Sequence, residues 1–127
     1  MGRLDDRVAI VTGGGRGIGQ ATPLRLAADG ASVVVNDIDD APANETVALI
    51  EAAGGKAIAC VANTVEMAQA ERLVQAAVDA YGKIDIIVNN AGVTRDKMFH
   101  GLDDAQFDFV FDANLKTGFH TTLAAMP

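Results

Sequence analysis

The sequence predicts an α/β fold in which one parallel β-sheet carries helices on both faces. Short apolar, β-branched runs of the kind buried in a parallel sheet alternate four times with segments of helical spacing. The links between them are short, and parallel strands joined by helices form such a layered sheet. A glycine cluster follows the first apolar run at once. We expect the sheet order 3-2-1-4.

The first strand–helix unit spans residues 7–12 and 18–29, with Gly30 ending the helix. Pro23 lies deep in that helix. There it removes a backbone hydrogen bond at a cost of about 3 kcal/mol. We therefore expect a local distortion. The apolar side of the helix consists of Leu24, Leu26 and Ala27.

The second unit begins with a strand over residues 31–36. Asp40 is the expected N-cap of its helix, Pro42 fits the first turn, and Gly54-Gly55 ends it. The apolar positions of this helix are Val47, Leu49 and Ile50.

The next elements are a third strand over residues 56–61 and a helix that ends at Gly82. Asn63 and Glu66 stand three apart as a possible capping box. A fourth strand is expected over residues 84–89. The apolar positions of the helix are Leu73, Val74, Ala77, Val78 and Tyr81.

A last helix is predicted to begin near Asp103 and Gln106, which form a box-like cap. Phe109 lies off its apolar stripe, as an exposed residue or part of a subunit contact. The stripe itself contains Phe107, Val110, Phe111, Leu115, Phe119 and Leu123.

Length, charge and composition exclude several classes of protein. The 127 residues suit one domain, residues 1–127, and half of them are hydrophobic. A net charge of −7 argues against a nucleic-acid partner. No apolar run or N-terminal signal segment predicts a membrane span or export, so we expect a cytoplasmic protein. Cys60 is expected to be a small buried hydrophobe, and His100 and His120 have no metal partners at ligand spacing.

A ligand-binding site is expected at the carboxyl ends of the first and fourth strands. In order 3-2-1-4 the switch point lies between these strands, and ligands bind outside the carboxyl ends there. The glycine turn (residues 13–19) and Asn89-Asn90-Ala91-Gly92 both emerge at that point. A strand that turns sharply into a helix aims backbone N–H groups and the positive end of the helix dipole at one place, which suits a phosphate.

The spelling of this turn is Thr12, Gly13, Gly17 and Gly19, the pattern TGxxxGxG. It resembles the short-chain dehydrogenase/reductase family, whose second signature matches residues 89–92. The resemblance implies a Rossmann-like domain that binds a nicotinamide dinucleotide. Residues 93–96 resemble the 3-oxoacyl-[acyl-carrier-protein] reductases and their 3-hydroxyacyl-CoA dehydrogenase relatives.

The expected pyrophosphate and nicotinamide contacts follow from these two signatures. The turn around the pyrophosphate consists of Thr12, Gly13, Gly17, Ile18 and Gly19. Asn90, Ala91 and Gly92 would face the nicotinamide side, and the asparagine side chains can tie this turn to the first one through Thr12.

The choice of cofactor depends on Asp37, which ends the second strand. Its carboxylate can accept both ribose hydroxyls of an adenosine and would repel a 2′-phosphate, which favours NAD(H). Arg16 could instead hold a 2′-phosphate, so NADP(H) stays possible. The alternative for Asp37 is a turn or cap aspartate, since Asp39 and Asp40 follow it.

Two further residues match family positions. Asn63 stands where the family usually has an Asp that touches the adenine amino group, and its oxygen can still accept that hydrogen bond. An N-cap role is the compatible alternative. Asn114, in a segment similar to the family's DxNLK, corresponds to the asparagine that holds a water in the proton relay. Its alternative is a polar residue on a helix surface.

The family's Ser, Tyr and Lys, the last two spaced as YxxxK, have no match in these residues. Ser32 and Tyr81 are the chain's Ser and Tyr, and Asp85 follows Tyr81 by four. The resemblance therefore implies the first half of the family's domain, truncated before the last strands. Strand four becomes an open edge and invites self-association, so we expect a homo-oligomer.

The leading interpretation is the cofactor-binding half of an NAD(H)-dependent oxidoreductase. By resemblance, its small-molecule substrate would be a 3-oxoacyl thioester or similar ketone, interconverted with its hydroxy form. The alternative is a non-catalytic nucleotide-binding or interaction module derived from this family.

Overall fold

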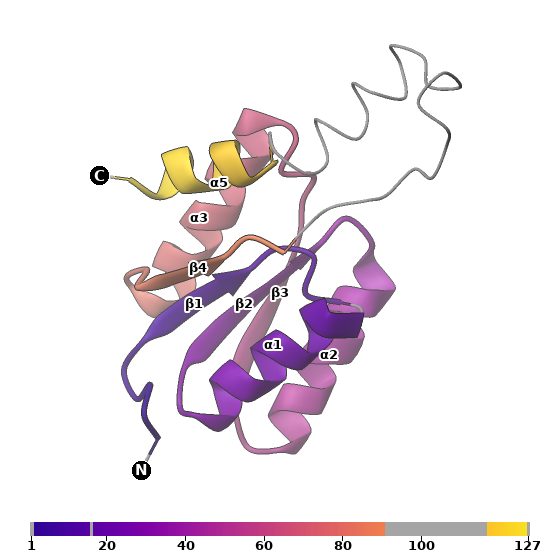
Figure 1. Cartoon of the computed structure of the whole chain (residues 1–127), viewed down its shortest axis with the longest axis vertical. Coiled ribbons are helices and arrows are strands. Elements are labelled where there is room, and N and C mark those ends of the chain that lie inside the picture. The colour runs from indigo at the N-terminus through magenta and orange to yellow at the C-terminus, as the bar shows by residue number, and fades with distance from the viewer. Residues whose placement is uncertain (1, 16, 91–116, 127) are drawn as a thin grey trace, which may run out of the picture.

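The computed structural model describes residues 2–15, 17–90 and 117–126 (Figure 1). The strands of these residues form a parallel sheet in the order β3-β2-β1-β4, which confirms the predicted topology. The elements are β1 (Val8–Val11), α1 (Gly17–Ala28), β2 (Ser32–Asp37), α2 (Asp40–Ala52), β3 (Lys56–Val61), α3 (Met67–Tyr81), β4 (Ile86–Val88) and α5 (Thr117–Ala125).

β1 lies between β2 and β4 and holds the sheet together. Its Ile10 pairs with Val34 on one side and with Ile87 on the other. All four side chains of β1 are buried, which agrees with the apolar run that predicted a central strand.

The alternation of side chains along the strands divides the core into two halves. On one face Ile10 and Val34 pack with Leu73 of α3. On the other face Val33 and Val35 pack with the apolar residues of α1 and α2. Figure 1 shows α1 and α2 over one face and α3 over the other, with α5 beside α3. Helices on both faces are therefore confirmed.

The helix predicted over residues 18–29 is observed as α1 (Gly17–Ala28), and it is continuous through the buried Pro23. Gly30 has φ 106°, a left-handed conformation that favours glycine and ends the helix as expected. Leu24, Leu26 and Ala27 pack against the core, which confirms the apolar side.

Two predictions for α2 need correction. Asp39, not Asp40, is the N-cap of α2, and its side chain makes no capping hydrogen bond. Leu49 is 44% exposed, because the buried face of α2 is set by Ala43, Thr46 and Ile50. The residue before Ile50 points about 100° away from that face.

The capping box of Asn63 and Glu66 is also not formed. α3 begins at Met67 with Glu66 as N-cap and no side-chain cap. The Asn63 side chain instead accepts a hydrogen bond from the Val65 N–H at 3.1 Å. Gln69 accepts the Asn63 N–H, the bond that a box would have given to Glu66.

β4 begins two residues later and ends one residue earlier than the predicted strand over 84–89. At its start the Asp85 side chain, and not a backbone carbonyl, accepts the Val8 N–H. One carboxylate oxygen accepts the Val8 N–H at 2.9 Å and also lies 3.0 Å from the Lys83 ammonium. The hydrogen bond from the Val8 N–H, followed by that from Lys83, holds the pKa of Asp85 below its usual value.

Cys60 is buried in the core beside Ile10, as predicted. Burial raises the pKa of its thiol, and the positive charge of Arg72 opposes this only partly. The thiol therefore stays neutral at physiological pH and acts as an apolar side chain.

The start of the predicted last helix, with residues 103–116, lies outside the described residues. Its continuation is helical as α5. Thr121 of α5 is buried, whereas Leu123 is 47% exposed. No helix among the described residues is long and apolar enough to cross a membrane.

We expect Leu73→Ala to lower the free energy of unfolding by about 2–5 kcal/mol, because Leu73 is fully buried between α3 and the sheet. The matched control is Leu49→Ala on α2, which is 44% exposed and should change stability by about 0.5 kcal/mol or less. Urea denaturation of both variants measures the difference. Equal losses in the two variants would contradict the assigned core.

Candidate functional site

The candidate site lies at the carboxyl edge of the sheet, the edge where all four parallel strands end. The glycine turn leaves β1, Asp37 ends β2, and Asn89-Asn90 leaves β4. β1 is hydrogen-bonded to both β2 and β4, so these three strand ends are adjacent. The structure therefore brings together the two turns that the sequence analysis placed at the switch point.

Asn90 ties the turn after β4 to the glycine turn. Its backbone N–H donates to the Thr12 hydroxyl oxygen at 3.0 Å, and its side-chain amide donates to the Gly13 carbonyl at 3.2 Å. The predicted link through Thr12 exists, but the backbone of Asn90 makes it and the side chain reaches one residue further. The Thr12 N–H also donates to the Val88 carbonyl at 3.1 Å.

Two glycines are required by geometry. Gly13 has φ 61°, in the left-handed region that favours glycine. A Cβ at Gly19 would overlap the Gly13 carbonyl oxygen and the Asn90 side-chain amide. The first turn of α1 therefore lies directly against the strand exit, and a side chain at position 19 would separate the two.

Asp37 is buried and is held on both carboxylate oxygens. Oδ2 accepts the Gly15 N–H at 3.2 Å, and Oδ1 accepts the Asp39 N–H at 3.1 Å. Asp37 therefore does act as a turn aspartate, the alternative role that the sequence analysis left open. A carboxylate has about four acceptor positions, so further hydroxyl groups can still bind it.

Asn36 is a site-forming residue that the sequence analysis missed. Its side chain is buried, and its amide donates to the Cys60 and Ala62 carbonyls at 3.0 and 3.1 Å. These bonds join the ends of β2 and β3 and thereby position Asp37. The sequence feature that could have identified it is its position directly after a buried valine run, where a polar side chain needs hydrogen-bond partners.

Thr46 of α2 was missed as well. Its hydroxyl donates to the Gly14 carbonyl at 3.1 Å, across 32 residues of sequence. Its spacing from Ala43 and Ile50 places it on the buried face of the helix. That spacing could have identified it.

Asn63 lies beyond the end of β3, two residues after Val61, which pairs with Asp37. Its side-chain oxygen binds Val65 and keeps one lone pair for another donor. Arg16, Ala91, Gly92 and Asn114 lie outside the described residues. For Gly17 and Ile18 the structure describes only their place at the start of α1.

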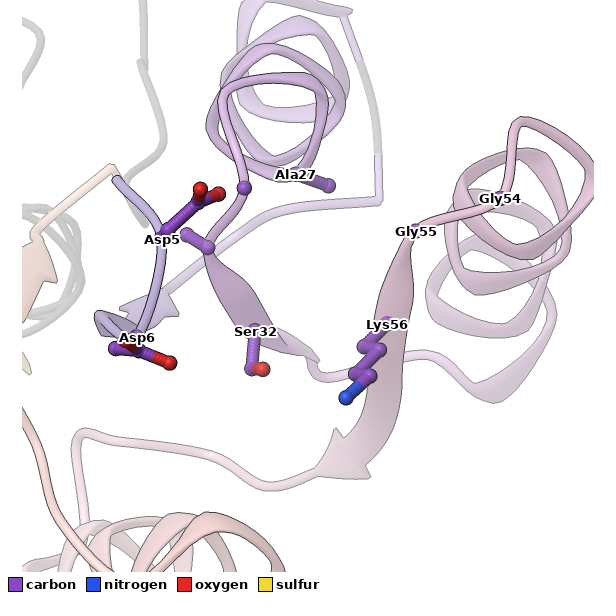
Figure 2. A pocket seen from close by; sticks show the side chains of 9 residues that line it. Asp5, Asp6, Ala27, Ser32, Gly54, Gly55 and Lys56 are labelled. Atoms are coloured by element: carbon purple, nitrogen blue, oxygen red, sulfur yellow. The ribbon is translucent and has the colours of Figure 1, made fainter. Parts of the chain in front are cut away.

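A hollow lies at the opposite edge of the sheet (Figure 2). Asp5, Asp6, Ser32 and Lys56 line it, and the last two begin β2 and β3. It is therefore separate from the carboxyl edge. Among the described residues no three His, Cys, Asp or Glu side chains are grouped to hold a metal ion.

Comparison with known proteins identifies the family. The family model described as short chain dehydrogenase matches residues 7–127. The chain belongs to the short-chain dehydrogenase family. This confirms the resemblance carried by the two glycine-containing signatures.

Two curated relatives illustrate the similarity. A peroxisomal hydratase-dehydrogenase-epimerase of Neurospora crassa is 45% identical over 121 residues, covering 95% of this chain and 13% of that protein. The 3-oxoacyl-[acyl-carrier-protein] reductase of Thermotoga maritima is 37% identical, covering 98% of this chain and 51% of that protein. The chain thus spans about half, or less, of the length of these relatives.

Solved structures agree. A short chain dehydrogenase from Mycobacterium avium superposes with TM-score 0.96 at 44% identity, covering 98% of this chain and 46% of that one. A hydroxysteroid dehydrogenase from Escherichia coli gives TM-score 0.93 at 38% identity, covering 97% and 52%. These short-chain dehydrogenases confirm the predicted Rossmann-like fold.

We expect Gly15→Ala to displace Asp37, because a Cβ at position 15 would lie 2.6 Å from both the Asp37 carboxylate and the Pro42 Cβ. Such overpacking costs about 1–3 kcal/mol of stability. Amide hydrogen exchange of Asp39, whose N–H binds Asp37 at 3.1 Å, reports the displacement.

The control is Gly54→Ala, which strains a left-handed glycine but meets no atom within 4 Å. It should lower stability and leave the Asp39 amide protected. An unchanged Asp39 amide in Gly15→Ala would contradict the assigned contact.

Proposed function

We propose that this chain is the NAD(H)-binding half of an oxidoreductase that interconverts a ketone, such as a 3-oxoacyl thioester, and its hydroxy form. One observation carries the proposal. The glycine turn is hydrogen-bonded to Asn90 on one side and, through Gly15, to the buried carboxylate of Asp37 on the other. A dinucleotide needs a ribose acceptor, a pyrophosphate seat and a nicotinamide border in this order, and Asp37, the glycine turn and the turn at Asn90 follow one another in the same way.

The pyrophosphate would bind over the glycine turn and the N-terminus of α1. Thr12, Gly13, Gly17, Ile18 and Gly19 would form this seat, where the start of α1 and the positive end of its dipole favour an anion. Gly19 supports the assignment because its missing Cβ lets the helix start lie against the Gly13 carbonyl. Arg16 lies in the same turn and could instead hold a 2′-phosphate, so NADP(H) stays possible.

Asp37 would bind the adenosine ribose and select NAD(H) over NADP(H). Asp37 is 7% exposed, so a 2′-phosphate would meet a negative charge poorly screened by water. Asn63, two residues beyond the end of β3, would accept a hydrogen bond from the adenine amino group. Ile38 follows Asp37 in the sequence and is 64% exposed, so an uncovered apolar side chain lies next to this ribose site.

The reacting end would lie beside the turn after β4, bordered by Asn90, Ala91 and Gly92. A bound nicotinamide supplies the hydride or accepts it. Asn114 would hold a water of the proton relay. Reductase and dehydrogenase activities appear in the names of the two curated relatives, which supports the reaction class. A homo-oligomer and a cytoplasmic location stay predictions.

Titration of the chain with NADH and NADPH tests the proposal. We expect NADH to bind more tightly, and we expect Asp37→Ala to weaken NADH binding by about 10-fold or more. The same variant should bind NADPH more tightly than the wild-type chain does, because the charge that repels the 2′-phosphate is removed. Loss of hydrogen bonds to a charged group costs about 1.5–3 kcal/mol, and 1.4 kcal/mol is tenfold in affinity. Isothermal calorimetry measures both constants.

The control is Asp40→Ala, which removes an exposed carboxylate three residues away that accepts a hydrogen bond from the Asn44 side-chain amide. It should leave the preference unchanged. Absence of binding to either nucleotide by the folded chain would overturn the proposal. Binding without turnover of an acetoacetyl thioester would favour the non-catalytic module.

A further inference from the structure

We infer that Thr46 is a positioning residue that sets the preference for NADH by orienting the peptide between Gly14 and Gly15. This inference rests on the proposed function, because it explains how the ribose carboxylate of Asp37 is held. Thr46 belongs to α2 and would not itself touch the nucleotide.

The carbonyl and the N–H of one peptide unit are fixed by two different side chains. The Gly14 carbonyl accepts the Thr46 hydroxyl at 3.1 Å. The Gly15 N–H, on the same peptide, donates to Asp37 Oδ2 at 3.2 Å. A planar peptide turns as one body, so a change at the carbonyl redirects the N–H that holds the carboxylate.

Glycines make this peptide dependent on outside contacts. Neither Gly14 nor Gly15 has a side chain that restricts rotation about its backbone bonds. The Gly14 N–H donates to the Asn36 carbonyl at 2.7 Å, which fixes the entry to the peptide. The plane of the peptide is held at its two ends, at the Gly15 N–H by Asp37 and at the Gly14 carbonyl by the Thr46 hydroxyl.

Thr46 is itself held in place. It is fully buried, and its hydroxyl accepts the Gln20 side-chain amide of α1 at 3.3 Å. The Pro42 carbonyl, four residues earlier in α2, lies 3.2 Å from the same hydroxyl and shares its one proton with the Gly14 carbonyl. A threonine inside a helix commonly bonds such a carbonyl, but the bond to Gly14 leaves the helix and reaches the glycine turn.

The test compares Thr46→Val, which keeps the shape and removes the hydroxyl, with Thr46→Ser, which keeps the hydroxyl. We expect Thr46→Val to reduce the ratio of NADPH to NADH dissociation constants about fivefold, since a lost hydrogen bond of ~1 kcal/mol corresponds to that factor. Thr46→Ser should retain the wild-type ratio. A general loss of folded protein weakens both apparent affinities equally and leaves the ratio unchanged.

Thr121→Val is the matched control, because Thr121 is equally buried but lies on α5, which packs against α3 on the other face. Its ratio should stay at the wild-type value. An unchanged ratio in Thr46→Val, or a lost ratio in Thr46→Ser, would overturn the inference. If Thr46→Val does not fold, Thr46→Ala serves as the variant without a hydroxyl, with the same expected loss.

Amide hydrogen exchange of Gly15 without nucleotide separates the two proposals. Faster exchange at Gly15 in Thr46→Val supports the peptide coupling, and unchanged exchange overturns it. Failure of the wild-type chain to bind NADH overturns the proposed function, whatever the exchange at Gly15 shows.

Discussion

The carboxyl edge of this sheet depends on how one short piece of backbone is held after β1. Gly13 to Gly15 carry no side chains, so their conformation comes from the strands and helices around them. β4 contributes through Asn90, β2 through the Asn36 carbonyl and the Asp37 carboxylate, and α2 through Thr46. A loop without internal restraint is thus given a defined shape by three neighbouring elements.

The core makes such contacts possible because the sheet is rigid and buried on both faces. Val33 and Val35 pack toward α1 and α2, whereas Val34 packs toward α3. Parallel pairing in register from Ser32 to Asp37 places the ends of β2 and β3 side by side. The buried Asn36 amide then joins the two strand ends by its hydrogen bonds to the Cys60 and Ala62 carbonyls, so Asp37 has little freedom to move.

Much of this could be predicted from the sequence, and the parts that could not share a cause. Buried strands and the glycine turn follow from local composition, since an apolar run and a glycine cluster each have few structural solutions. The residue at which a helix begins does not follow from local composition. Asp39 and Asp40 are equally good N-cap residues by type. The hydrogen bond from the Asp39 N–H to the Asp37 carboxylate decides which of the two becomes the N-cap.

The same limit explains why Thr46 and Asn36 were missed. Each acts through a carbonyl group, and a carbonyl is present at every position, so sequence cannot say which one a side chain will reach. Thr46 finds its partner 32 residues away, and Asn36 finds its two partners 24 and 26 residues away. Only the folded sheet defines those pairs.

Asp37 combines a structural and a proposed binding role without conflict. The turn uses one acceptor position on each carboxylate oxygen, and both donors are backbone N–H groups that stabilise the negative charge. Binding a ribose would then require no reorganisation of the carboxylate, since the backbone has already oriented it. A carboxylate held before its ligand arrives loses less conformational freedom on binding, so of the three neighbouring acids the buried turn aspartate would be the best ribose acceptor.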